Sequence, residues 1–117
     1  MTFPCMASPE RFGYKWAHYS KILPEQEAQF RKWIGPLGPE DFRLKRVLDA
    51  GCGIGANALP VLRWGATSVT AFDADPRTVA AAVENLKAFP NVTVLLRSIF
   101  DISWQEEFDI AMSIGFI

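Results

Sequence analysis

The chain has 117 residues, of which 50% are hydrophobic and 21% charged, and its formal net charge is −1. This composition supports a packed core, excludes a disordered chain, and gives no electrostatic reason to expect a nucleic acid or an anionic membrane surface as partner. No apolar run reaches the roughly 20 residues of a membrane-spanning helix, and the start of the chain lacks a signal-peptide pattern, so a cytoplasmic protein is expected. The cysteines Cys5 and Cys52 and the single histidine, His18, offer neither a disulfide framework nor the spacing of a metal site.

The N-terminal segment, residues 1–20, is rich in aromatic side chains. Residues 1–9 are predicted to be disordered, as chain ends commonly are. The aromatic residues that follow lie near helical spacing, which favours packing beneath the first helix as part of the core. They are Phe12, Tyr14, Trp16 and Tyr19.

Residue 21 begins a region that we expect to form a single domain. A helix is predicted from Pro24 to the Gly35-Pro36 pair, with acidic residues in its first turn and basic residues in its last. Its apolar stripe is expected to lie on a sheet and comprises Phe30, Trp33, Ile34 and Leu37.

Strands and helices then alternate, which is typical of a doubly wound parallel sheet. Short apolar runs predict a strand beginning at Val47 and a buried strand over residues 110–117. A helix is predicted over residues 57–64, in which Pro60 either lies near the first turn or kinks the helix. Another follows the N-cap Asp75 and ends before Pro90. Its buried face is expected to carry Val79, Ala82, Val83 and Leu86.

A glycine-rich turn follows the first strand, where residues 47–55 are Val-Leu-Asp-Ala-Gly-Cys-Gly-Ile-Gly. Gly51 and Gly53 can adopt backbone angles closed to other residues and let a ligand approach the main chain. The next helix adds free backbone N–H groups. Together with Ala56 and the later Asp73, these glycines also satisfy the fingerprint of a dinucleotide-binding turn. The glycine spacing alone therefore leaves two classes of nucleotide-like cofactor open.

Asp49 distinguishes between these two classes. It directs a negative charge into the crevice where a pyrophosphate would lie against the helix N-terminus. A cofactor that bears an ammonium group and no phosphate suits this position, because the acid can pair with the cation. The alternative is that Asp49 caps the amides of its own loop. Asp73 likewise has an alternative as a turn residue, although its spacing favours a contact with ribose hydroxyls.

Four stretches in this order resemble the motifs of the class I S-adenosylmethionine-dependent methyltransferase family. Residues 47–55 resemble the first motif, residues 69–73 the strand that ends in the ribose-binding acid, and residues 91–94 and 108–115 the third and fourth strands. The resemblance implies a Rossmann-like sheet whose first four parallel strands have the order 3-2-1-4 with flanking helices. Since the chain stops after an apolar run, residues 21–117 are expected to be the N-terminal half of a methyltransferase domain, with the C-terminal half missing.

The resemblance also assigns a cofactor, S-adenosylmethionine, and its contacts. The loop that includes Cys52 would hold the methionine part, although the Cys52 side chain itself is expected to be a small packing residue. The family often carries an acid where this chain has Ser98, and Asp101 is a candidate substitute. The expected cofactor-binding residues are Asp49, Gly51, Cys52, Gly53, Asp73, Ala74, Ser98 and Ile99.

In many members of this family a segment ahead of the first strand folds over the ligands. The aromatic segment therefore has a second interpretation as a lid, in which Tyr14 or Trp16 would contact the sulfonium through a cation–π interaction. His18 would then be a candidate base, although a lone histidine is weak evidence.

The implied activity is methyl transfer to an oxygen, nitrogen, carbon or sulfur atom, and we expect a small-molecule acceptor. No catalytic residue is assigned, because in this family acceptor contacts often lie beyond the fourth strand. Two alternatives stay open. One is a fragment of an NAD-binding oxidoreductase, and the other is a non-catalytic interaction module. An exposed edge on the fourth strand would let such a chain pair with a partner or with itself.

Overall fold

The computed structural model describes residues 20–103 and 107–114. Its four strands form one parallel sheet with the order β3-β2-β1-β4, which confirms the predicted fold. The elements in chain order are α2 (Pro24–Trp33), α3 (Pro39–Phe42), β1 (Arg46–Ala50), α4 (Ala58–Arg63), β2 (Ser68–Asp73), α5 (Pro76–Leu86), β3 (Val92–Leu96), the 3-10 helix η1 (Ile99–Asp101) and β4 (Ile110–Met112).

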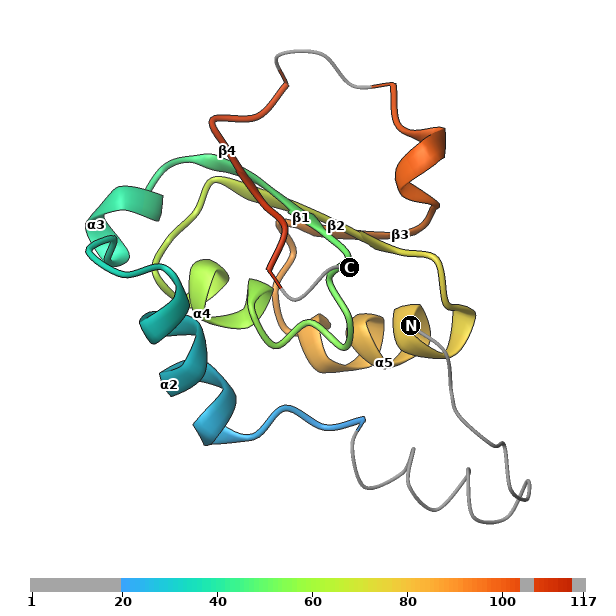
Figure 1. Ribbon diagram of the computed structural model, residues 1–117, viewed down its shortest axis with the longest axis horizontal. Helices are drawn as coiled ribbons and strands as arrows, with labels where there is room; N and C mark the ends of the chain where they lie inside the picture. The colour runs from blue at the N-terminus through green and yellow to red at the C-terminus, as the bar shows by residue number, and fades with distance from the viewer. Residues whose placement is uncertain (1–19, 104–106, 115–117) are drawn as a thin grey trace.

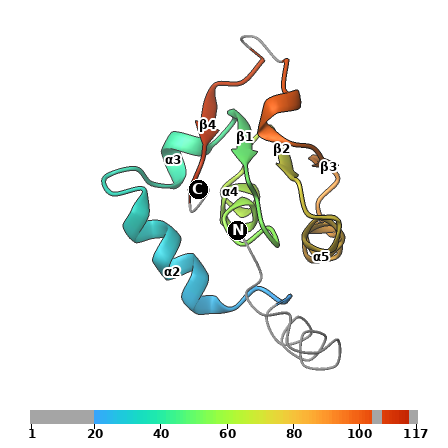
Figure 2. The same ribbon diagram turned by 45° about the vertical axis from the view of Figure 1, so that its right-hand side comes forward.

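The helices α2, α4 and α5 lie on one side of the sheet, and η1 lies on the other (Figures 1 and 2). The strand register explains why the core is on the helical side. Val47, Val69 and Val92 are neighbours across three strands, so their side chains form an apolar row on one face. Buried residues of the helices pack against this row, among them Val61 of α4 and Leu86 of α5.

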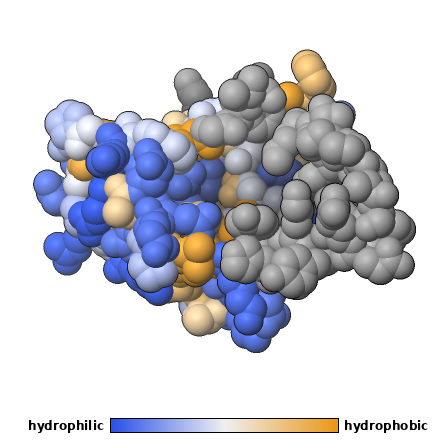
Figure 3. Space-filling view, turned by 60° about the horizontal axis from the view of Figure 1, so that its bottom comes forward, coloured by the Kyte–Doolittle hydropathy of each residue, from blue (hydrophilic) through white to orange (hydrophobic). Residues whose placement is uncertain are grey.

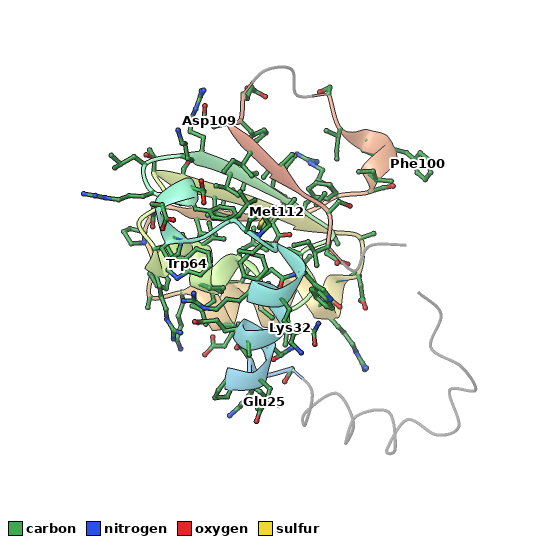
Figure 4. The ribbon with its side chains drawn as sticks, turned by 60° about the vertical axis from the view of Figure 1, so that its left-hand side comes forward. Glu25, Lys32, Trp64, Phe100, Asp109 and Met112 are labelled. Carbon is green, nitrogen blue, oxygen red and sulfur yellow. The ribbon has the colours of Figure 1, made fainter. Side chains whose placement is uncertain are left out.

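An aromatic cluster holds α2 and α3 against the end of α4. The ring centroid of Trp64 lies 5.8 Å from that of Phe30 and 5.6 Å from that of Phe42. The guanidinium of Arg31 lies over the Trp64 ring at 4.9 Å. Such tilted ring contacts add to the stabilisation from burial alone. Figure 4 shows Trp64 on the side of the molecule where α2 packs.

Three of the predicted buried side chains are exposed. Trp33 is 55% exposed, because α2 packs on the core through Phe30 and Ile34. Leu37 is 46% exposed, because α2 ends at Trp33 and the left-handed residue Gly35 (φ 63°) lies between the helix and Leu37. Val83 is 50% exposed, since α5 rests on the sheet through Ala82 and Leu86. The stripe predicted for α2 is therefore narrower than expected and consists of Phe30 and Ile34.

The first three strands begin and end close to the predicted positions, whereas β4 is shorter than its apolar run. The aromatic residues of the N-terminal segment and residues 115–117 lie outside the described part of the chain. Sequence periodicity did not predict α3 or η1, which are single turns. Asp75 caps α5 as predicted, and its carboxylate accepts a hydrogen bond from the Arg77 N–H at 3.0 Å.

A charged pair aligns β4 with β1. The Asp109 carboxylate accepts hydrogen bonds from the Arg46 backbone N–H at 2.8 Å and from its guanidinium at 3.1 and 3.2 Å. These contacts lower the pKa of Asp109 to about 2, with the Arg46 side-chain hydrogen bond as the largest cause. Figure 4 shows Asp109 at the start of β4, with Met112 farther along the strand toward the core.

Candidate cofactor site

The glycine loop connects β1 to α4 at the carboxyl ends of the strands. The order of the sheet reverses at β1, because β2 lies on one side of this strand and β4 on the other. Ligands of open α/β sheets bind in the crevice at such a switch point. Gly51, Gly53 and Gly55 all have positive φ angles, of 68°, 57° and 93°. The loop thus needs glycine at each of these positions, as predicted for Gly51 and Gly53.

The last of these glycines also faces a steric limit. A Cβ atom on Gly55 would lie 3.0 Å from Cδ1 of the buried Leu86, whereas at Gly53 it would meet nothing within 4 Å. The loop therefore packs closely against Leu86 of α5 at Gly55, and it has free space beside its backbone at Gly53. The open part is where a ligand can approach the backbone.

Asp73 links the end of β2 to the glycine loop. One carboxylate oxygen accepts a hydrogen bond from the Gly53 N–H at 3.1 Å, and the other accepts one from the Asp75 N–H at 3.0 Å. A further bond, from the Cys52 N–H to the Phe72 carbonyl at 2.8 Å, joins the same two segments. These contacts hold Asp73 beside the glycines of the loop.

Among the residues that the structure describes, Asp49 is the one buried charged residue, with 1% of its surface exposed. Neither of its carboxylate oxygens has a hydrogen-bond partner among the described residues. Burial, and secondly the negative charge of Asp73, raise the pKa of Asp49 to about 7. The alternative that Asp49 caps the amides of its own loop is therefore wrong. A buried carboxylate without partners carries a free-energy penalty that a cationic ligand would remove.

The side chain of Cys52 is buried, with 5% of the residue exposed. It packs with Ala71, Ala82 and the partly buried Val94, which confirms the predicted packing role. Burial raises the pKa of the Cys52 thiol, and the charges of Asp49 and Asp73 raise it further. Any contact between Cys52 and a cofactor would therefore come from its backbone.

The residues assigned to the adenine lie at the ends of β2 and β3. Ala74 is exposed, and Ile99 is 41% exposed. The Ser98 hydroxyl oxygen accepts a hydrogen bond from the Phe100 N–H at 3.2 Å and so caps η1. Phe100 is 92% exposed and points away from the sheet (Figure 4). Tyr14, Trp16 and His18 lie outside the described residues.

One residue of this region was not predicted. Asn85, on α5, donates hydrogen bonds from its amide to the carbonyl of Ile54 at 3.0 Å and to that of Ser20 at 2.8 Å. Its partners are 31 and 65 residues away in the sequence. No periodicity or motif spacing signals contacts of this kind.

A cavity of about 380 Å³ opens beside the loop, between the start of α2 and α4. It includes Ala56 of the loop but none of the predicted cofactor residues. The described residues on the face drawn in Figure 3 are largely hydrophilic, with several apolar residues near the centre of the view. Within residues 20–103 and 107–114 there is no cluster of acidic, cysteine or histidine residues that could hold a metal ion. In the same ranges, no helix is long and apolar enough to cross a membrane.

A family model described as a methyltransferase domain matches residues 47–117. The chain belongs to the class I S-adenosylmethionine-dependent methyltransferase family. The matched residues contain the glycine loop, Asp73, the strands β2, β3 and β4, and all of β1 except its first residue, Arg46. Membership in this methyltransferase family replaces the alternative of an NAD-binding oxidoreductase.

Several proteins similar to this methyltransferase domain are known. A ribosomal protein L11 methyltransferase from Teredinibacter turnerae is 43% identical over 51 residues, which are 44% of this chain and 17% of that protein. A 16S rRNA methyltransferase from T. thermophilus, solved with AdoMet and guanosine, has a TM-score of 0.65 and 29% identity over 81% of this chain and 26% of its own. Protein arginine methyltransferase 10 of Arabidopsis thaliana has a TM-score of 0.61 and 31% identity, over 74% of this chain and 25% of its own.

These comparisons correct the predicted partners of the methyltransferase domain. The names of the matched proteins refer to a ribosomal protein, a ribosomal RNA and protein arginine. The prediction of a small-molecule acceptor, with no nucleic acid among the partners, is therefore wrong. The expectation of no nucleic acid rested on the formal net charge of −1. The chain matches only 17% of the length of a curated relative, so its own charge does not represent that of the whole protein.

Proposed function

We propose that this chain binds S-adenosylmethionine in the crevice at the carboxyl ends of β1 and β2. The observation that carries the proposal is Asp49, a buried carboxylate with no hydrogen-bond partner among the described residues. It lies two residues before a glycine loop with positive φ angles at Gly51 and Gly53. A ligand with an ammonium group and no phosphate fits this combination of an unpaired acid and an open backbone.

Each end of the crevice suits a different part of the cofactor. Asp49 would pair with the ammonium group of the methionine part, directly or through water. Asp73 would accept hydrogen bonds from the ribose hydroxyls, because each carboxylate oxygen has a second lone pair beyond the one used by Gly53 or Asp75. Ala74, Ser98 and Ile99 would border the adenine at the ends of the neighbouring strands.

The chemistry that S-adenosylmethionine supplies is an activated methyl group on a sulfonium, which is displaced by a nucleophile. The task of the protein is to hold this group in line with the acceptor and to exclude water. Asp49 and Asp73 would fix the two ends of the cofactor and so orient the methyl group. None of the described residues is proposed as a general base.

The acceptor is proposed to be a macromolecule, with ribosomal protein as the leading class. The four curated proteins matched at 41–49% identity are all named ribosomal protein L11 methyltransferases. A second class, ribosomal RNA, is supported by the T. thermophilus rRNA methyltransferase, which matches 81% of this chain. Both proposals concern the whole protein that contains this chain.

The cofactor is tested by titration calorimetry of the chain with S-adenosylhomocysteine, with NAD in a matched run. We expect saturable binding of the first ligand alone. Binding of NAD, or of neither ligand by a folded chain, would contradict the proposal. Loss of binding in Asp49→Asn in a folded variant would connect the affinity to the carboxylate.

The acceptor is tested with tritium-labelled S-adenosylmethionine and the whole protein. Purified ribosomal protein L11 and purified 16S rRNA serve as parallel substrates. Label in the protein is expected. Label in the RNA alone would favour the second class, and label in neither would overturn both.

A further inference from the structure

Asn85 bridges two segments that are distant in the sequence. Its half-buried side-chain amide donates one hydrogen bond to the carbonyl of Ser20, just ahead of α2, and one to the carbonyl of Ile54, inside the glycine loop. An amide NH2 group has two donors, and both are used here. The same side chain therefore fixes the position of both backbone segments.

The neighbouring residue strengthens this arrangement. Leu86 is buried and lies against Gly55, close enough that a Cβ atom there would be 3.0 Å from its Cδ1. Asn85 and Leu86 thus hold Ile54 and Gly55 by a polar and an apolar contact, while Asp73 holds Gly53. The last turn of α5 consequently contacts the glycine loop at Ile54 and Gly55, whereas a Cβ atom at Gly53 would meet nothing within 4 Å.

We propose that Asn85 is a positioning residue that couples the segment entering α2 to the glycine loop. The proposal rests on the proposed function, because the loop is the part that would hold S-adenosylmethionine. A ligand that orders the loop would strengthen the link through Asn85 to Ser20. By thermodynamic reciprocity, docking of residues 20–22 would raise the affinity for the cofactor by the same factor.

This coupling has a physical basis in the two carbonyl groups. When the amide is removed, both carbonyls lose a partner in a half-buried setting, and each segment can then open without the other. Because Ser20 and Ile54 lie far apart in the sequence, the Asn85 amide joins them by a tertiary contact. Asn85 acts on the cofactor through the loop and is not proposed to touch it.

The chain contains a matched control. Asn91 is also half-buried, and its amide also donates to two backbone carbonyls, those of Ala66 at 3.0 Å and Thr67 at 3.4 Å. These contacts lie at the start of β2 and β3, at the opposite end of the strands from the loop. Asn91→Ala therefore removes the same chemistry without touching the glycine loop.

The first test compares S-adenosylhomocysteine binding by calorimetry in the wild-type chain, Asn85→Ala, Asn85→Asp and Asn91→Ala. Asn85→Asp keeps the shape of the side chain but has no donors. We expect the dissociation constant to rise about three- to tenfold in both Asn85 variants and to stay within about twofold in Asn91→Ala. Wild-type affinity in Asn85→Asp, or an equal loss in Asn91→Ala, would overturn the proposal.

The second test needs no ligand. Hydrogen exchange by mass spectrometry is measured on peptides that cover residues 20–23 and 53–57. Both should exchange faster in Asn85→Asp than in the wild type, and neither should change in Asn91→Ala. Faster exchange in only one of the two segments would overturn the coupling. Absence of ligand binding by the wild-type chain would instead contradict the proposed function, and the exchange result would still decide the role of Asn85.

Discussion

Asp49 and Asp73 end up in opposite environments although both lie at the carboxyl ends of adjacent strands. Asp73 accepts hydrogen bonds from two backbone N–H groups, those of Gly53 and Asp75. Asp49 has no hydrogen-bond partner among the described residues and is 1% exposed. The negative charge of Asp73 also contributes to the raised pKa of Asp49. Asp73 therefore stabilises the glycine loop, whereas the carboxylate of Asp49 is available to pair with a cationic ligand.

The first prediction concerns the stability of Asp49→Asn. The pKa of Asp49 is raised from 3.8 to about 7 in the folded chain, so the folded state binds a proton more tightly than the unfolded state. Asp49 therefore has no effect on the free energy of unfolding below pH 3.8. As the pH rises from 3.8 toward 7, its ionisation in the unfolded state lowers the free energy of unfolding. At pH 8 we expect Asp49→Asn to be more stable than the wild type, on the order of 2 kcal/mol. Urea unfolding at pH 5 and pH 8 measures the difference.

Asp109→Asn is a control with the opposite sign. Arg46 lowers the pKa of Asp109 to about 2, so this group contributes stability above pH 3.8 that is lost as the pH falls through 2. Asp109→Asn should therefore reduce stability at both pH 5 and pH 8, without a difference between them. If the free energy of unfolding of Asp49→Asn changes between pH 5 and pH 8 as it does in the wild type, the charge of Asp49 is compensated in the folded chain.

The second prediction concerns the pH dependence of cofactor binding. Pairing with an ammonium group requires ionised Asp49, and in the free chain its pKa is about 7. Below that pH, binding must displace a proton, so the affinity for S-adenosylhomocysteine should fall as the pH decreases. We expect binding at pH 6 to be weaker than at pH 8 by up to about tenfold, since one pKa unit corresponds to a tenfold change.

Calorimetry at pH 6, 7 and 8 measures this change. Repetition in buffers of different ionisation enthalpy should reveal proton release at pH 6 that disappears at pH 8. Asp49→Asn should bind more weakly and without this pH dependence. An equal affinity of the wild-type chain at pH 6 and pH 8 would mean that Asp49 is not the partner of the ammonium group.

The sequence predicted the sheet and the loop because both depend on local patterns. A glycine-rich turn after an apolar run defines Gly51 and Gly53, and the spacing to the next strand places Asp73. The exposure of Trp33 and Leu37 was not predictable in this way. Apolar periodicity shows which residues share a face of a helix, whereas the turn at Gly35 decides how far that face stays on the sheet.

The unpaired state of Asp49 and the bridge made by Asn85 depend on tertiary contacts. The motif predicted a ligand-binding acid before the loop, and the less favoured alternative was that Asp49 caps the amides of its own loop. Only the positions of neighbouring N–H groups distinguish the two, because they bond to Asp73 and leave Asp49 without a partner. Asn85 sits on the helix that also carries the predicted apolar face, and nothing in that pattern indicates contacts 31 and 65 residues away.

The third prediction concerns Asp73→Ala. The substitution removes the acceptors of the Gly53 and Asp75 N–H groups and the proposed contact with ribose. We expect a loss of about 1–3 kcal/mol in the free energy of unfolding and a loss of S-adenosylhomocysteine binding of at least about tenfold. Urea unfolding and calorimetry measure the two effects.

Asp75→Ala provides the matched control. Asp75 caps α5 through the Arg77 N–H and the Thr78 hydroxyl, both at 3.0 Å, so its removal costs about 1 kcal/mol. Asp75 is not among the proposed cofactor contacts, and its alanine variant should retain binding. If the two variants lose affinity equally, the effect of Asp73→Ala is a consequence of destabilisation rather than of a lost ligand contact.

The fourth prediction concerns Gly55→Ala. Its φ angle of 93° disfavours any residue with a Cβ atom, and that atom would lie 3.0 Å from Cδ1 of Leu86. The backbone strain costs about 1–2 kcal/mol, and the crowding in a packed core adds about 1–3 kcal/mol. We therefore expect a total destabilisation of about 2–5 kcal/mol, measured by urea unfolding, and weaker S-adenosylhomocysteine binding because the loop must shift.

Gly35→Ala separates these two contributions. Gly35 also has a positive φ angle, 63°, but a Cβ atom there would meet nothing within 4 Å, and the residue lies outside the predicted site. It should show the backbone cost alone, with unchanged ligand binding. The double variant Gly55→Ala/Leu86→Ala should relieve the crowding but not the strain, so the two substitutions should be less destabilising together than the sum of their separate effects. Strict additivity would mean that Leu86 does not limit the space at Gly55, and the packing of α5 against the glycine loop would then need another explanation.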